Sequence, residues 1–342
     1  MRVTVIGGGS WGTTVAMLTS HNADVTLWAL EPEIVDHINR RHENLIFLSG
    51  VLLPDRLWST IALDEALTGA EAVITGVPSQ YLRSLMEKAE PFIAPHVPVV
   101  SLTKGIEQAS LKRPTQVLGE VLERHDPSRI GVLSGPNIAR EVAAGQPAAT
   151  VIALPEPEVA HSMQQVLMTP RFRVYTNPDV VGCEIGGAVK NVIAVAAGMA
   201  DGLGFGDTTK AALITRGLAE LTRFGVRCGG SPMTFLGLAG NGDLIVTCMS
   251  RLSRNHHVGQ QLGLGRPLDE ILGEMTMVAE GVKSAPAVLQ LAHEADVGMP
   301  ICEEVAQVLA GAHSPQEAME ALMSRDPPTT ELHGLDERVS GN

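Results

Sequence analysis

A glycine-rich turn near the start of the chain, Gly7-Gly-Gly-Ser-Trp-Gly12, constrains the fold more than any other feature of the sequence. It follows a short β-branched run, Arg2–Ile6, and precedes a segment of helical character. In this setting the pattern G-x-G-x-x-G, with glycines at 7, 9 and 12, is typical of a turn that binds a dinucleotide pyrophosphate. The first glycine permits the tight turn, the second lets backbone approach the phosphates, and the third lets helix and strand pack closely. The start of the helix adds N–H groups and a positive dipole.

The first half of the chain alternates apolar runs with segments of helical spacing. The strand-like runs lie at 2–6, 25–28, 72–75, 97–102, 130–133 and 150–154, and helical patterns begin at Glu31, Ser79 and Arg113. Strands that are apolar along nearly their whole length belong to parallel sheets covered on both faces. We therefore predict a doubly wound, Rossmann-like α/β domain with a parallel sheet.

The second half of the chain shows long helical patterns and almost no strand signals. These patterns lie at 180–200, 210–224, 268–275, 284–295 and 301–309. A length of 342 residues favours two domains. We predict a dinucleotide-binding domain over 1–178, an all-helical substrate and catalytic domain over 179–325, and a flexible C-terminal tail over 326–342.

Composition limits the partners and the compartment. The chain has 25 basic and 38 acidic side chains, a net charge of −13, so nucleic acid is not an expected partner. Cys183, Cys228, Cys248 and Cys302 form no C-x-x-C pair, which predicts neither a zinc site nor disulfides. The longest apolar stretch is far shorter than the roughly 20 residues of a membrane span. With no signal peptide visible, we expect a cytoplasmic protein without a membrane span or a bound metal.

The residue after the second predicted strand bears on cofactor preference. In dinucleotide-binding domains an acidic side chain there binds the ribose 2′-hydroxyl of NAD, whereas an Arg accommodates the 2′-phosphate of NADP. Glu31 follows Ala29 and Leu30 at this place. It favours NAD, although a solvated Glu at the start of a helix explains the residue equally well.

Four polar groups in otherwise apolar or glycine-rich surroundings are candidates for chemistry. Lys190 lies in an apolar helical stretch, and a buried ammonium needs a carboxylate partner. Asp243, flanked by glycines, is the candidate partner. Ser253-Arg254-Asn255 offers a guanidinium fork for a phosphate, and Lys104 ends a predicted strand at the crevice where open α/β sheets bind ligands. The adjacent His256-His257 is interpreted as a solvated pair, not as a metal site.

Taken together, these residues resemble the bacterial-type NAD(P)-dependent glycerol-3-phosphate dehydrogenases. The stretches that carry the resemblance span nearly the whole chain: 7–13, 101–106, 133–136, 187–191, 201–210, 239–248, 253–255 and 278–281. The resemblance implies reversible reduction of dihydroxyacetone phosphate to sn-glycerol 3-phosphate, which supplies phospholipid synthesis.

The resemblance also implies roles for individual residues. Lys190 would exchange the proton at the C2 oxygen of the substrate, with Asp243 orienting it. The other substrate contacts would come from Lys104, Gly135, Asn137, Ser253, Arg254 and Asn255. The dinucleotide would be lined by Ser10, Trp11, Lys104, Ala139, Arg254, Val278 and Glu280, in addition to Gly7, Gly9, Gly12 and Glu31, which the glycine pattern and the second strand already indicate.

Three positions depart from the pattern of the family. Asn137-Ile138 replaces the usual Ser-Phe, Leu30-Glu31 replaces the usual Arg, and Asn241 replaces a Leu. Two other functions stay open: a dehydrogenase of the same architecture that acts on a 2-oxo or 3-hydroxy acid, and a non-catalytic nucleotide sensor. A homodimer is plausible because apolar helices often pair across a two-fold axis.

Overall fold

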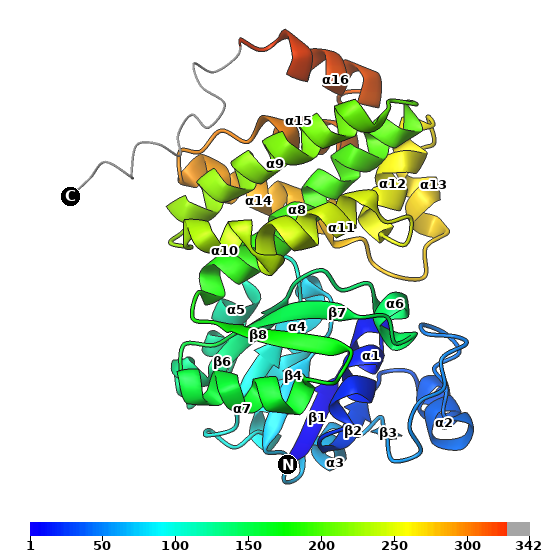
Figure 1. Cartoon of the computed structure of the whole chain (residues 1–342), viewed down its shortest axis with the longest axis vertical. Helices are drawn as coiled ribbons and strands as arrows, with labels where there is room; N and C mark the ends of the chain where they lie inside the picture. Colours follow the sequence, from blue (N-terminus) through cyan, green and yellow to red (C-terminus); the bar gives the residue numbers. More distant parts are fainter. Residues whose placement is uncertain (327–342) are drawn as a thin grey trace, which may run out of the picture. The chain divides into compact units, whose positions relative to one another are not determined.

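The computed structural model describes residues 1–326, and the chain divides into two compact units (Figure 1). The first unit consists of residues 1–104 and 112–180. The second consists, among the described residues, of the segment Gly105–Leu111 and residues 181–326. Except for Asp326, the predicted tail lies outside the described residues.

The first unit is built on a sheet to which the described residues contribute eight strands, in the order β3-β2-β1-β4-β5-β6-β7-β8. The strands are β1 (Arg2–Ile6), β2 (Asp24–Trp28), β3 (Trp58–Thr60), β4 (Ala72–Thr75), β5 (Val99–Ser101), β6 (Ile130–Ser134), β7 (Ala148–Ala153) and β8 (Phe172–Asn177). All neighbours are parallel except β6 and β7. The doubly wound α/β fold is thus confirmed, with β3 and β8 as strands that the sequence did not reveal.

The antiparallel β7 follows from the connection that precedes it. Between β6 and β7 the chain forms only a short helix, α6 (Ala139–Ala143), and this helix packs against α1 (Ser10–Thr19), with Thr14 Oγ1 donating to Ala139 O at 3.4 Å. No helix in this connection carries the chain back to the other end of the sheet. The chain therefore re-enters the sheet at the edge where β6 left it, and β7 runs in the opposite direction.

Helices cover both faces of this sheet. Besides α1 and α6 they are α2 (Pro32–Arg41), α3 (Leu63–Leu67), α4 (Ser79–Ala89), α5 (Pro114–Val121) and α7 (Pro157–Leu167). Successive strand residues enter different cores: Val5 packs in the cluster that includes Val15 of α1, and Ile6 packs in the cluster that includes Leu82 of α4. This alternation, with both faces buried, is what a doubly wound sheet requires.

The second unit is helical, with no strand among residues 181–326. Its helices are α8 (Val180–Gly202), α9 (Asp207–Arg227), α10 (Pro232–Leu236), α11 (Asp243–Met249), α12 (Arg254–Gly263), α13 (Leu268–Gly273), α14 (Glu280–Glu294), α15 (Pro300–Leu309) and α16 (Pro315–Ser324). Helix α8 is long and apolar enough to cross a membrane, but 89% of that apolar window is buried inside the protein. It is the core helix of this unit, since every residue from 182 to 200 is buried.

Two glycine-lined helices, α8 and α12, touch backbone to backbone. A methyl group on Gly198 would lie 2.0 Å from His256 O, and one on Gly259 would lie 1.9 Å from Val195 O. No Cβ fits at either place, so glycine is required for this approach.

A buried carboxylate meets the start of α15. Glu220 of α9 is 2% exposed and accepts hydrogen bonds from Ile301 N at 2.8 Å and Cys302 N at 3.4 Å. Burial raises the pKa of Glu220 to about 7, even though these two N–H groups favour the charged form.

The segment Gly105–Leu111 joins the second unit although the chain around it belongs to the first. Ile106 is fully buried in the core of the second unit, and its N–H donates to Ser284 Oγ at 3.2 Å. Gln108 Nε2 donates to Lys283 O at 2.6 Å. The segment is therefore held on α14 by both an apolar side chain and hydrogen bonds.

Candidate functional site

The three motif glycines occupy different environments. Gly7 has φ +125°, and a methyl group on it would lie 2.7 Å from Gly76 O. One on Gly12 would lie 2.0 Å from Gly7 O, so the turn needs glycine at both positions. At Gly9, by contrast, a methyl group would meet no atom within 4 Å. The turn is therefore closed on the protein side and open beside Gly9, at the start of α1, which fits a pyrophosphate group there.

Asn44, which the sequence analysis missed, stabilises the glycine-rich turn by hydrogen bonds from a neighbouring segment. It is fully buried, and its Nδ2 donates to Gly8 O at 2.7 Å and to Thr13 Oγ1 at 2.8 Å. Its Oδ1 accepts from Phe47 N at 3.0 Å. Since each end of the amide has a partner, Asn44 holds the glycine turn to the segment after α2.

The other residues predicted to contact the dinucleotide in this unit lie at the ends of its elements. Ser10 begins α1, Ala139 begins α6, and Glu31 is the residue before α2. The indole of Trp11 packs edge-on against Phe172 with ring centroids 6.3 Å apart. Its Nε1 is buried and has no partner within the described part of the chain.

Lys104 and Asn137 lie beside Gly135, after strands β5 and β6. Lys104 Nζ donates to Gly135 O at 2.9 Å. Thr150 Oγ1 donates its proton to Ser134 O at 2.9 Å and must therefore accept from the Asn137 amide, also at 2.9 Å. This fixes Asn137 Nδ2 toward Thr150, and the Oδ1 is left buried without a partner in the residues described. Asn137 thus offers an acceptor.

In the second unit, Lys190 and Asp243 form the buried ion pair that the sequence predicts. Lys190 Nζ lies 2.5 Å from Asp243 Oδ1, with 5% of Lys190 and 1% of Asp243 exposed. Lys190 also donates to Thr247 Oγ1 at 2.7 Å, and this hydroxyl donates to Asp243 O at 2.6 Å. A π-helical turn over Leu238–Gly242 delivers Asp243 to the start of α11, and such turns are frequent at functional sites. The carboxylate and hydroxyl together fix the position of the ammonium.

The segment Ser253–Asn255 joins three helices near this pair. Asn255 Nδ2 donates to Asn191 Oδ1 at 2.9 Å, and its Oδ1 accepts from Gly281 N at 2.9 Å. Ser253 caps α12 by accepting from His256 N at 3.3 Å.

Arg254 is exposed and points to the segment before α14. Its Nη1 donates to Val278 O at 2.8 Å, and Glu280 begins α14 two residues later. The structure thus brings Arg254, Val278 and Glu280 together, as it does Lys190 with Asp243.

The interpretation of His256-His257 as a solvated pair is wrong for His256. His256 is 2% exposed and its Nε2 lies 2.8 Å from Asp201 Oδ2, whereas His257 is exposed. Consecutive residues of a helix point about 100° apart, so one faces α8 while the other faces solvent. Across the described residues, no cluster of three His, Cys, Asp or Glu side chains could hold a metal ion.

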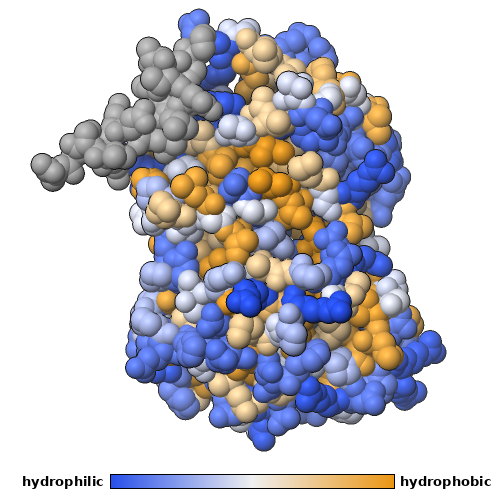
Figure 2. All heavy atoms as spheres, in the orientation of Figure 1, coloured by the Kyte–Doolittle hydropathy of each residue, from blue (hydrophilic) through white to orange (hydrophobic). Residues whose placement is uncertain are grey.

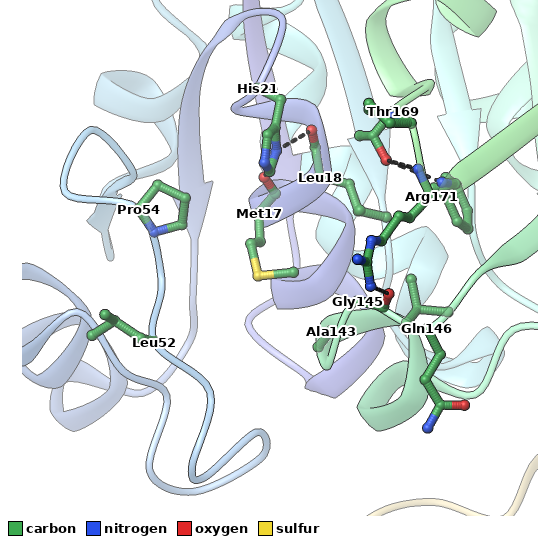
Figure 3. Close-up of a pocket in the computed structure, with 13 residues that line it drawn as sticks. Met17, Leu18, His21, Leu52, Pro54, Ala143, Gly145, Gln146, Thr169 and Arg171 are labelled. Atoms are coloured by element: carbon green, nitrogen blue, oxygen red, sulfur yellow. Dashed lines mark hydrogen bonds between the residues drawn. The ribbon is translucent and has the colours of Figure 1, made fainter.

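A separate cavity of about 500 Å³ lies in the first unit (Figure 3). Met17 of α1 and His21, which follows this helix, line it together with Leu52 from the chain after α2, and Gln146 and Arg171 close the other side. None of the predicted site residues lines it.

Comparison with known proteins identifies relatives along nearly the whole chain. Residues 2–160 match the family described as NAD-dependent glycerol-3-phosphate dehydrogenase N-terminus, and residues 179–320 match the corresponding C-terminus. The chain is 51% identical to glycerol-3-phosphate dehydrogenase [NAD(P)+] 2 of Sphingopyxis alaskensis, over 94% of this chain and 96% of the relative. It is 50% identical to glycerol-3-phosphate dehydrogenase [NAD(P)+] of Geobacter sulfurreducens, over 95% and 97%. The crystal structure of glycerol-3-phosphate dehydrogenase from Coxiella burnetii matches with a TM-score of 0.90 and 33% identity, over 95% of this chain and 99% of that one.

Proposed function

The chain belongs to the NAD-dependent glycerol-3-phosphate dehydrogenase family, and we propose on that basis that Lys190 is its proton donor and acceptor. The reaction is the reversible, NAD(P)H-dependent reduction of dihydroxyacetone phosphate to sn-glycerol 3-phosphate, which supplies phospholipid synthesis. The observation that carries the assignment of Lys190 is its buried pairing with Asp243 and Thr247. An ammonium held in place can stabilise and protonate an oxygen on which negative charge develops.

The reaction then proceeds as follows. A nicotinamide cofactor held at the glycine turn would supply the hydride for C2 of the substrate, and negative charge would then develop on the C2 oxygen beside Lys190. Lys190 gives this oxygen a proton, and the neutral amine recovers one from solvent before the next turnover. Asp243 favours the charged form of Lys190 and thereby keeps the ammonium ready.

The remaining substrate contacts are proposed for individual residues. Arg254 binds the phosphate group with its guanidinium fork, supported by Ser253 and Asn255. Because the phosphate lies away from the reacting carbon, its binding energy serves to orient the substrate. Lys104, which donates to Gly135 O, and the Gly135 backbone are two further proposed contacts, and Asn137 Oδ1 would accept a hydrogen bond from a substrate hydroxyl. The serine usual at this position could donate or accept, whereas Asn137, whose Nδ2 is bound to Thr150, has its Oδ1 available as an acceptor.

We assign cofactor binding to the glycine turn, Ser10, Trp11 and Ala139, and to Arg254, Val278 and Glu280. The cofactor is NAD(P)H, and Glu31 favours NADH because its carboxylate can bind two ribose hydroxyls and repels a 2′-phosphate. Initial rates with NADH and NADPH side by side test this preference. A higher kcat/KM with NADPH would refute the role of Glu31.

A small panel of oxo substrates tests the reaction itself. The panel contains dihydroxyacetone phosphate, dihydroxyacetone and a 2-oxo acid, each assayed with both cofactors. We expect turnover of the triose phosphate to exceed the others by orders of magnitude. A preference for the 2-oxo acid would favour the other dehydrogenase class, and cofactor binding without any turnover would favour the nucleotide sensor.

Three further expectations complete the proposal. The dinucleotide-binding domain spans 1–178 apart from the segment Gly105–Leu111, which packs with the helical domain of 179–325, and the tail follows. The protein is cytoplasmic, in keeping with four cysteines that form no disulfide, three of them buried. It forms a homodimer, for which the supporting observation is that α10 and α11 leave Met233, Leu236 and Met249 more than half exposed. Size-exclusion chromatography with light scattering measures the molar mass in solution and thereby distinguishes a monomer from a dimer.

A further inference from the structure

A polar network outside the proposed machinery connects three helices of the second unit. Asp201, in the last turn of α8, lies with Oδ1 2.6 Å from Lys210 Nζ of α9 and with Oδ2 2.8 Å from His256 Nε2 of α12. The side chain of His256 is 3% exposed, that of Lys210 is 16% exposed and that of Asp201 is 21% exposed. Burial acts to raise the pKa of Asp201, but the hydrogen bonds from Lys210 and His256 outweigh it, and the pKa is lowered. The carboxylate is therefore charged and engaged on both oxygens.

The network connects two helices that pack unusually closely. Where α8 and α12 meet at Gly198 and Gly259, backbone touches backbone. Ridges of side chains normally set how one helix sits along another, and the glycines remove them at these two places. Two polar contacts between the helices, His256 with Asp201 and Asn255 with Asn191, add to what fixes the register.

His256 lies directly beside the residues proposed to bind phosphate. Its own N–H donates to Ser253 Oγ, and Arg254 is two residues before it. A shift of α12 along α8 would therefore displace the guanidinium and the cap together. Displacements of about 1 Å at a substrate-positioning group can cost about a hundredfold in rate.

We infer that Asp201, Lys210 and His256 form a positioning network that sets the register of α12 on α8 and thereby places Ser253–Asn255 for the substrate phosphate. The inference rests on the proposed function, which assigns phosphate binding to that segment. These residues do not touch the reacting atoms. They act through Arg254 and its neighbours.

The test compares a substrate that has the phosphate with one that lacks it. We expect His256→Leu to lower kcat/KM for dihydroxyacetone phosphate by about ten- to a hundredfold and to leave that for dihydroxyacetone within about twofold. His256→Gln keeps an N–H donor for Asp201 and should recover most of the loss. His257→Leu makes the same substitution on the neighbouring exposed histidine and should change neither rate.

Each other outcome overturns the inference. Equal losses for both substrates would assign the network a role in stability alone, and no loss with either would remove it from substrate binding. Should His256→Leu fail to fold, Asp201→Asn keeps the shape of the carboxylate and supplies the same comparison. Failure of the proposed function is a distinct result, since the wild-type protein itself would then show no preference for the phosphorylated substrate.

Discussion

Replacing Lys190 by Met tests the proposed chemistry and separates it from folding. Met approximates the length of the Lys side chain but removes the ammonium, which leaves Asp243 as a buried carboxylate without its cation. A buried ion pair that loses one partner costs about 3–5 kcal/mol of stability. With 1% of Asp243 exposed, we expect the full effect in the free energy of unfolding. Adding Asp243→Asn removes the uncompensated charge and should recover most of that stability.

Lys190→Met should also lower turnover, by an amount that follows from the two roles of the ammonium. Loss of a positioned general acid costs about 10²–10⁴ in rate, and loss of a group that stabilises a developing oxyanion costs about 10²–10³. Because the same ammonium does both at one oxygen, the two factors overlap, and we expect a fall in kcat of about 10³–10⁴, or about 4–5.5 kcal/mol. The double variant should be as inactive as the single one, although it is more stable.

Two assays separate the effect of Lys190→Met on stability from its effect on turnover. Urea unfolding gives the free energy of unfolding for the wild type, Lys190→Met and the double variant, and NADH absorbance gives the rate with dihydroxyacetone phosphate. Titration with NADH serves as the control, since the glycine turn is unchanged and cofactor binding should persist. Turnover by Lys190→Met within about tenfold of wild type would refute the acid–base role. A double variant that regained activity along with stability would show that Lys190 acts only in folding.

Three further predictions follow from other described residues. Gly12→Ala should abolish cofactor binding because the added methyl group has no room, whereas Gly9→Ala should fold normally, since its methyl group meets no atom of the protein, and bind NADH more weakly. Thermal unfolding and NADH titration measure the two effects, and equal effects of both variants would refute the distinction. Asn44→Ala should raise the KM for NADH about tenfold with little change in kcat, and an unchanged KM would exclude its role in the glycine turn. Because the pKa of Glu220 is raised to about 7 in the folded protein, the wild type should lose up to about 3 kcal/mol of unfolding free energy as pH rises from about 4.5 to about 7. Glu220→Gln should abolish this loss, as urea unfolding across that pH range would measure. The same pH profile in the variant and the wild type would contradict the prediction.

The sequence alone predicts a functional residue where its role can be recognised from its neighbours in the chain. The glycine turn stands directly between a strand and a helix, so its role follows from neighbours in the chain. Lys190 is conspicuous because an ammonium in an apolar helix needs a partner, and Asp243 was the nearest candidate by motif. The structure joins them at 2.5 Å.

What the sequence could not reveal depends on contacts between distant residues. Asn44 reaches Gly8 across 36 residues and Asn137 reaches Thr150 across 13, and no local pattern distinguishes either from a solvated amide. His256 was misjudged for the same reason, since its partner Asp201 is 55 residues away. The short strand β3 has three residues, too few for a period to be recognised.

The segment Gly105–Leu111 decides how the protein can be dissected. Because the chain leaves the first unit after Lys104 and returns at Lys112, no single cut yields two intact halves. A fragment ending at residue 178 would carry Ile106 without the core that buries it. Expression of the halves as separate polypeptides therefore calls for a short linker in place of those seven residues in the first, and for their attachment to the second.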